Sequence, residues 1–131
     1  MMAQPATYFA PQLYIQAGSY DTSFYEKAFN AVELRRFTNE DGSIHVAELS
    51  IDGAIFQVHE EKPGAGRLSP EGISGTTVLV GLFVPDVDKT MAQALEAGAI
   101  LVTPVQDYDY GYRQAELKDP FGHTWMIEQA I

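Results

Sequence analysis

The feature that most constrains the fold of this chain is an internal repeat. Residues that begin helices, end helices and make turns recur in the same order, 67 to 69 positions apart. The matched landmarks are Asp21 with Asp88, Asn30 with Gly98, Gly42 with Gly111, and Gly53 with Gly122. Chance could supply one such match, but four in order predict a duplicated module.

Each half of the repeat has the pattern of a strand, a helix and three further strands. The first half is expected to form a strand at 11–17, a helix that begins near 21 and ends at 29, and strands at 32–38, 44–51 and 54–60. The second is expected to form a strand at 76–84, a helix from about 86 that Gly98 stops, a strand at 100–102 ended by Pro104, and strands at 112–117 and 123–129. The segment between them, 61–75, is rich in Pro and Gly and is either a linker or a functional lid.

A duplicated module of this kind predicts an α+β fold with an open ligand cleft. A helix covers only one face of each four-stranded sheet, so the other face must meet something else. Pairing of the halves would give an eight-stranded, incompletely closed barrel with a concave cleft. We therefore expect one domain over 1–131, made of modules 11–60 and 76–131 that loop 61–75 joins.

Composition argues against several kinds of partner. The chain of 131 residues has no cysteine, and 8 Lys and Arg against 18 Asp and Glu give a net charge of −10. This charge argues against nucleic acid and anionic membrane as partners and would favour a cationic small molecule. Neither a basic, apolar leader nor an 18-residue apolar run is present, so we expect a cytoplasmic protein.

Four segments resemble a known superfamily. They are Phe24–Phe29, Val84–Asp88, Ala97–Ala99 and, most specifically, Asp119-Pro120-Phe121-Gly122-His123-Thr124-Trp125. Together they resemble the vicinal oxygen chelate superfamily of glyoxalases, bleomycin-resistance proteins and dioxygenases, and look most like its phosphonate-operon-associated, glyoxalase-like branch. The resemblance spans about Pro11 to Ile131. It implies the fold strongly and the activity weakly, because this fold hosts many chemistries.

The same resemblance implies where metal ligands would lie in metal-using members. These positions fall on Gln12, Gln57, Leu79 and Met126. Leu79 cannot bind a metal, and a thioether is too soft for the metals of these enzymes. We therefore expect no cofactor, and we expect these four side chains to line a cleft that binds a flat, weakly polar organic molecule.

An alternative metal site would use Gln12, His59 and Glu128. His59 and Glu128 lie two residues beyond the nominal positions, on the same strand faces, and are 69 residues apart. With a divalent Zn, Ni, Mn or Fe they would make a metal-dependent lyase, isomerase or dioxygenase in which Glu128 moves a proton. The simpler interpretations are a solvated His59 and a surface carboxylate at Glu128. A third possibility is that the chain retains only an assembly or scaffold role.

Three further expectations concern side chains near the cleft. Tyr110 and Arg113 would give it an aromatic rim and one cation, unless Arg113 pairs with Asp107 or Asp109. Pleat alternation places Trp125 and Ile127 toward the helix, and Met126 and Glu128 toward the cleft. His123 is expected to serve turn geometry and hydrogen bonding.

The open sheets also predict assembly. A four-stranded sheet that contains a strand as apolar as Thr77 to Val84 leaves a face that water should not contact. We expect a homodimer in which an open sheet of one chain meets that of the other around a two-fold axis. The length of loop 61–75 allows the halves to pair within one chain or between chains.

Overall fold

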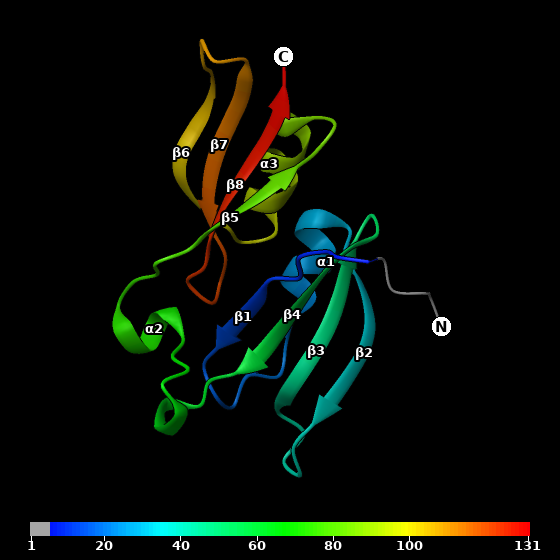
Figure 1. Ribbon diagram of the computed structural model, residues 1–131, viewed down its shortest axis with the longest axis vertical. Coiled ribbons are helices and arrows are strands. Elements are labelled where there is room, and N and C mark those ends of the chain that lie inside the picture. Colours follow the sequence, from blue (N-terminus) through cyan, green and yellow to red (C-terminus); the bar gives the residue numbers. More distant parts are fainter. Residues whose placement is uncertain (1–5) are drawn as a thin grey trace.

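The computed structural model describes residues 6–131 and contains two four-stranded sheets, one from each half of the repeat (Figure 1). The first half contains β1 (Gln12–Ile15), α1 (Ser23–Phe29), β2 (Val32–Thr38), β3 (Ile44–Ile51) and β4 (Ala54–Glu60). The second contains β5 (Leu79–Phe83), α3 (Val87–Glu96), β6 (Ile100–Asp107), β7 (Tyr112–Lys118) and β8 (Thr124–Ala130). The connection carries a short 3-10 turn, η1 (Pro63–Ala65), and α2 (Pro70–Ile73).

The two sheets have the same topology, which confirms the α+β fold with two βαβββ modules. Their strand orders are β1-β4-β3-β2 and β5-β8-β7-β6. In each sheet the first strand pairs in parallel with the last, and the other pairs are antiparallel. The sheets do not close into a barrel (Figure 1).

Local chemistry explains both long helices. Helix α1 buries Phe24, Tyr25, Ala28 and Phe29, which helical spacing places on one face, and it ends at Asn30 in the left-handed conformation with φ 56°. Helix α3 begins where Asp86 Oδ1 accepts a hydrogen bond from the backbone N–H of Lys89 at 3.1 Å, and it buries Val87, Met91 and Ala94.

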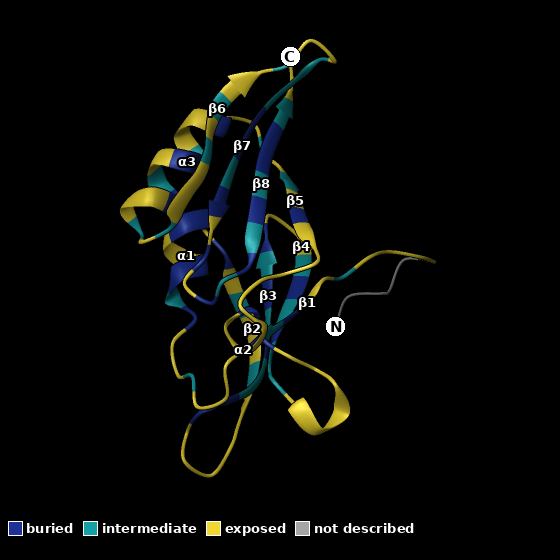
Figure 2. Cartoon of the chain, turned by 90° about the vertical axis from the view of Figure 1, so that its left-hand side faces the viewer, coloured by how far each residue is buried: buried dark blue, intermediate teal, exposed yellow. Residues whose placement is uncertain are grey.

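The helices lie on the same side of the molecule and contact each other (Figure 2). The Gln93 side chain of α3 donates to the backbone carbonyl of Lys27 at 2.8 Å and to Asn30 Oδ1 at 2.9 Å. The sheet faces turned toward the helices form the buried core, so that Trp125 and Ile127 are almost fully buried, as predicted. We call the opposite faces of the two sheets the open faces, because neither helix covers them.

A buried carboxylate joins the two halves on the helix side. Asp119 accepts hydrogen bonds from Tyr25 of α1 at 2.6 Å and from Trp125 of β8 at 3.0 Å. It also accepts from the backbone N–H groups of Phe121 and His123, at 2.9 and 3.0 Å. Burial, followed by the charge of Asp119, raises the pKa of Tyr25 well above its ordinary value. The Asp-Pro-Phe-Gly-His-x-Trp segment is thus a structural element of the core.

One local expectation was wrong. Pro104 does not end its strand: β6 continues to Asp107, with register irregularities between Leu101 and Gln106. Since β6 is an edge strand, a proline removes no essential ladder hydrogen bond there. The connection 61–75 contains short helical turns, in which Ser69 caps α2 and donates to Glu61 at 2.7 Å.

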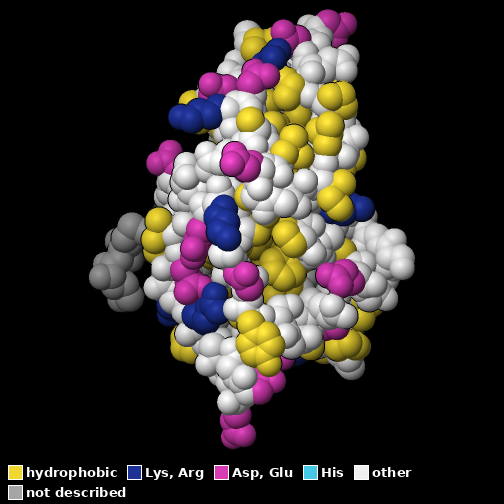
Figure 3. Space-filling model, turned by 180° about the vertical axis from the view of Figure 1, so that it is seen from behind, with side chains coloured by type: hydrophobic (Ala, Val, Ile, Leu, Met, Phe, Trp, Pro, Cys, Tyr) yellow, Lys and Arg dark blue, Asp and Glu magenta, His cyan; other side chains and the backbone are white. Residues whose placement is uncertain are grey.

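Hydrophobic side chains remain exposed at the edge of the second sheet. In the view from behind, hydrophobic side chains gather along the right-hand flank of the upper half (Figure 3). This flank is the left-hand one in Figure 1, where β6 lies. Ile100, Leu101 and Val102 of β6 are among the exposed large hydrophobic residues. Charged side chains of both signs lie toward the other flank (Figure 3).

Candidate functional site

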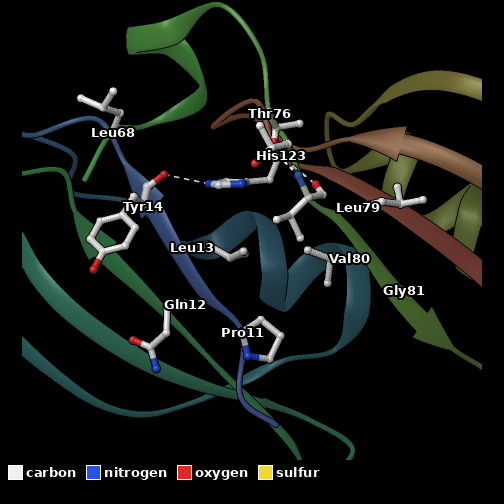
Figure 4. Close-up of a pocket in the computed structure, with 12 residues that line it drawn as sticks. Pro11, Gln12, Leu13, Tyr14, Leu68, Thr76, Leu79, Val80, Gly81 and His123 are labelled. Atoms are coloured by element: carbon white, nitrogen blue, oxygen red, sulfur yellow. Dashed lines mark hydrogen bonds between the residues drawn. The ribbon is translucent and has the colours of Figure 1, made fainter. Parts of the chain in front are cut away.

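An open pocket of about 480 Å³ lies where the edge strands β1 and β5 approach each other (Figure 4). Gln12 and Tyr14 of β1 line it from the first half, and residues 76–81 line it from the second. His123 lies between the two, and its Nε2 donates to the carbonyl oxygen of Tyr14 at 2.7 Å. This bond gives His123 the structural role expected for it.

The structure places the predicted residues Gln12 and Leu79 in this one pocket, although they come from different halves. Gln57 of β4 is the lateral neighbour of Gln12, and its amide donates to Glu48 at 3.2 Å. Met126 of β8 is the lateral neighbour of Gly81 of β5, which also lines the pocket. All four residues at the implied ligand positions therefore lie on the open faces.

His59 also lies on the open face of the first sheet, beside Tyr14. The two rings are 5.4 Å apart, and the ring of His45 is 4.9 Å from that of His59. His59 Nδ1 donates to the backbone carbonyl of Glu60 at 2.7 Å, which assigns the lone pair of the neutral ring to Nε2. His45 contacts the Glu60 carboxylate at 2.7 Å, and hydrogen bonds from His45 and Asn39 lower the pKa of Glu60.

Glu128 is buried, so the interpretation as a surface carboxylate was wrong. Its side chain is on the open face of β8, and the residue is 8% exposed. The Gln114 amide of β7 donates to Glu128 Oε1 at 2.8 Å, and the Tyr110 hydroxyl donates to Gln114 Oε1. The pKa of Tyr110 is raised by loss of solvation first, and then by the charges nearby, including that of Glu128.

Arg113 belongs to the other face, which corrects its assignment to the cleft rim. Since Gln114 faces the open side, its neighbour Arg113 points to the helix side of β7. There it donates to Asp88 at 2.9 and 3.0 Å and to Asp107 at 2.7 Å. The hydrogen bonds from Arg113 lower the pKa of Asp88, and the two aspartates raise the pKa of Arg113. Of the two partners considered as alternatives, Asp107 is the one that Arg113 contacts.

The proposed metal ligands are not assembled within one chain. Gln12 and His59 lie on adjacent strands of the first sheet, whereas Glu128 lies in the second sheet. Within residues 6–131 no three His, Cys, Asp or Glu side chains lie close enough together to hold a metal ion. The family's nominal positions offer two amides, a thioether and an aliphatic side chain, a donor set that does not fit a hard divalent metal.

Sequence reasoning missed three residues of this region. Gly81 is the only glycine inside a strand of the described chain, and such a glycine signals close approach of another group. Gln114 and Phe83 flank Glu128 across the sheet, but their proximity depends on strand register. Only the glycine signal could have been read from the sequence.

Comparison with known proteins places the chain in a family. The model of the glyoxalase/bleomycin resistance protein/dioxygenase superfamily matches residues 19–127. An uncharacterized protein of Mycobacterium tuberculosis is 37% identical over 125 residues, which cover 93% of this chain and 74% of that protein. An uncharacterized protein of Arabidopsis thaliana is 31% identical over 117 residues, 82% of this chain and 68% of the other.

Solved structures agree with this assignment. TioX from Micromonospora sp. ML1 has a TM-score of 0.70 at 25% identity, and the match covers 95% of this chain and 97% of TioX. The fosfomycin resistance protein FosX from Listeria monocytogenes, in complex with Mn(II) and sulfate, has a TM-score of 0.70 at 14% identity, with 98% and 93% covered. The chain therefore belongs to the glyoxalase/bleomycin resistance protein/dioxygenase superfamily and has its vicinal oxygen chelate fold. The phosphonate-operon branch stays a prediction.

No helix within residues 6–131 has the length and apolar character needed to cross a membrane.

Proposed function

We propose that this chain binds a small organic molecule in a cleft formed by the open faces of its sheets, and that a second copy of the chain completes the cleft. The observation that carries the proposal is the shared orientation of Gln12, Gln57, Leu79 and Met126 on the open faces. Two of them already share a pocket with each other. Amide, thioether and aliphatic groups together suit a flat, weakly polar ligand.

A second copy is the occupant that the open faces favour. Large hydrophobic residues on these faces are between 45% and 62% exposed in one chain, namely Val32, Phe37, Leu79, Phe83 and Ile100. Exposed apolar side chains on a sheet face favour contact with a second chain. A two-fold pairing would cover these side chains in both chains at once.

The names of relatives support small-molecule binding as the class of function. The superfamily name includes bleomycin resistance, and a protein with the same fold is a fosfomycin resistance protein. Binding without a catalytic metal is favoured by the donor set at the nominal positions.

A ligand screen with cleft variants tests the proposal. The purified protein is screened by thermal shift against small aromatic molecules of positive, zero and negative charge, and hits are measured by calorimetry. We expect at least one ligand with a dissociation constant below about 1 mM, and loss of its binding in Met126→Arg. The matched control is Ala92→Arg, which adds the same charge on an exposed position of α3. No binding in the whole panel, or equal binding by both variants, would refute the proposal.

A metal-dependent lyase, isomerase or dioxygenase is the second candidate. One observation favours it: the hydrogen bond of His59 Nδ1 leaves Nε2 as the metal-binding nitrogen, a common arrangement in metal sites. Gln12 and Glu128 would complete the donor set only if two chains bring the halves together. Metal analysis of protein purified without chelator tests it. Less than about 0.1 equivalent of any transition metal, with no thermal shift on adding Zn, Ni, Mn or Fe, would refute it.

A further inference from the structure

Glu128 is a buried acid that has no basic partner among the described residues. The residue is 8% exposed, yet no Lys or Arg nitrogen of residues 6–131 lies within 4.0 Å of its carboxylate, and the salt bridges of this part of the chain all involve other acids. Burying a carboxylate is costly unless a cation or several hydrogen bonds offset the lost hydration. A cation from outside the described residues would offset this cost.

The carboxylate is held so that one oxygen stays available. Gln114 donates to Oε1 at 2.8 Å, and Tyr110 in turn holds Gln114 through its hydroxyl. Oε2 receives no hydrogen bond from the described residues, and it is not sealed from water, because no buried side-chain oxygen in that part of the chain lacks a partner. The network therefore fixes the side chain and leaves Oε2 to accept from a ligand.

Gly81 makes room for this oxygen. A Cβ built at Gly81 would lie 2.9 Å from Glu128 Oε2, closer than real Cβ atoms approach an oxygen. Gly81 has no unusual backbone angle that would require glycine. Its role is thus spatial, and it connects Glu128 to the pocket, since Gly81 also lines that pocket.

Aromatic rings flank the carboxylate on the same open face. Phe83 of β5 is the lateral neighbour of Glu128, and its ring centroid lies 5.7 Å from that of Tyr112 of β7. Tyr110 contacts Tyr112 in turn, with ring centroids 5.9 Å apart. Phe83 and Tyr110 are each 60% exposed, so their rings are accessible. A carboxylate beside exposed rings is the arrangement that binds organic ammonium groups, through an ion pair and cation–π attraction.

We propose that Glu128, Phe83 and Tyr112 form the subsite for a protonated amine carried by an aryl or alkyl ligand. The proposal rests on the proposed small-molecule function and adds to it the charge class of the ligand and the residues that select it. Gln114 and Gly81 act as positioning residues that aim Oε2. The rest of the ligand would lie toward Gly81 and the pocket at β1 and β5.

Three soluble probes of similar size test the charge preference at neutral pH: tryptamine, which is a cation, tryptophol, which is neutral, and indole-3-propionate, which is an anion. Calorimetry or amide NMR titration measures each. We expect tryptamine to bind at least about tenfold more tightly than the other two. In Glu128→Gln, which preserves shape and removes the charge, we expect the preference to fall below about twofold while tryptophol binding stays unchanged.

Gly81→Ala serves as a second variant, because it keeps the charge and displaces the carboxylate. We expect it to weaken tryptamine binding more than tryptophol binding, so that the ratio of the two affinities falls. Equal affinity of the wild-type protein for tryptamine and tryptophol, or no tryptamine binding up to about 10 mM, overturns the inference. If tryptophol still binds and Met126→Arg abolishes it, the proposed function survives that failure. If Glu128→Gln instead weakens the dimer in sedimentation, a cation of the second copy occupies the carboxylate, and the inference is also overturned.

Discussion

The two faces of each sheet differ in what their polar groups do. On the helix side, Asp119 accepts hydrogen bonds from four donors, and Arg113 donates to two aspartates. On the open side, one oxygen of Glu128 accepts no hydrogen bond from residues 6–131, and the Phe83 side chain is exposed. Saturated polar groups specify a fold, whereas unsaturated ones next to apolar surface remain available to a ligand or a second chain. The comparison therefore divides the molecule into a folding face and a binding face.

The largest effect is expected where the folding face is broken. Asp119→Ala removes the acceptor of Tyr25 and Trp125 and of two backbone N–H groups, and leaves these donors buried. We expect the free energy of unfolding to fall by about 3–4 kcal/mol, as measured by urea denaturation. A loss below about 1 kcal/mol would show that Asp119 does not hold the halves together.

Tyr25→Phe should have a smaller effect, because only one of the four donors is lost. We expect a loss of about 1–2 kcal/mol near neutral pH. Asp119 keeps its other three hydrogen bonds in this variant. If Tyr25→Phe lowered the free energy of unfolding as much as Asp119→Ala does, the loss of stability would not follow the number of hydrogen bonds removed.

The same variant should change the response to alkali. The pKa of Tyr25 is raised in the folded protein, so only the unfolded chain loses this proton near pH 10. Its stabilising contribution is therefore complete below about pH 10 and declines as the pH rises further, by about 1.4 kcal/mol per pH unit. The free energies of unfolding of wild type and Tyr25→Phe, measured as a function of pH, should converge as the pH rises. A constant difference between them would contradict a raised pKa of Tyr25 in the folded protein.

Gln12→Ala, on the binding face, should weaken ligand binding and leave stability almost unchanged. Gln12 is exposed on an edge strand, so we expect its loss to change the free energy of unfolding by less than about 0.5 kcal/mol. Ligand affinity should fall severalfold, as measured by calorimetry with a ligand from the screen. If Gln12→Ala instead lowered the free energy of unfolding and left ligand affinity unchanged, Gln12 would serve folding and not binding.

Arg113→Met should affect binding least of all. Its partners are Asp88 and Asp107, both exposed on the helix side. We expect ligand affinity to stay unchanged and the pKa of Asp88 to return toward its ordinary value, measured by NMR titration of the carboxyl carbon. Weaker ligand binding by this variant would show that Arg113 does contribute to the cleft.

The sequence predicted the fold well because the repeat and the pleat alternation are local patterns. The helix boundary at Asn30 and the inward orientation of Trp125 both follow from a few neighbouring residues. The continuation of β6 through Pro104 was missed, because it depends on the strand being at an edge. The environment of Glu128 was missed for a related reason: Gln114 and Phe83 reach it only through the register of three strands. Arg113 was misplaced because its partner Asp88 is on a distant helix.

The central claim is that the open faces of two copies form a shared cleft, and a subunit-mixing experiment tests it most directly. Gln57→Arg blocks the first-half wall, and Met126→Arg blocks the second-half wall. Each variant alone should fail to bind the ligand from the screen. After refolding an equal mixture of the two, we predict that about one quarter of the clefts bind again, because a mixed dimer has one cleft with both walls intact. No recovery of binding, or sedimentation as a single species of 14.4 kDa, would contradict the claim.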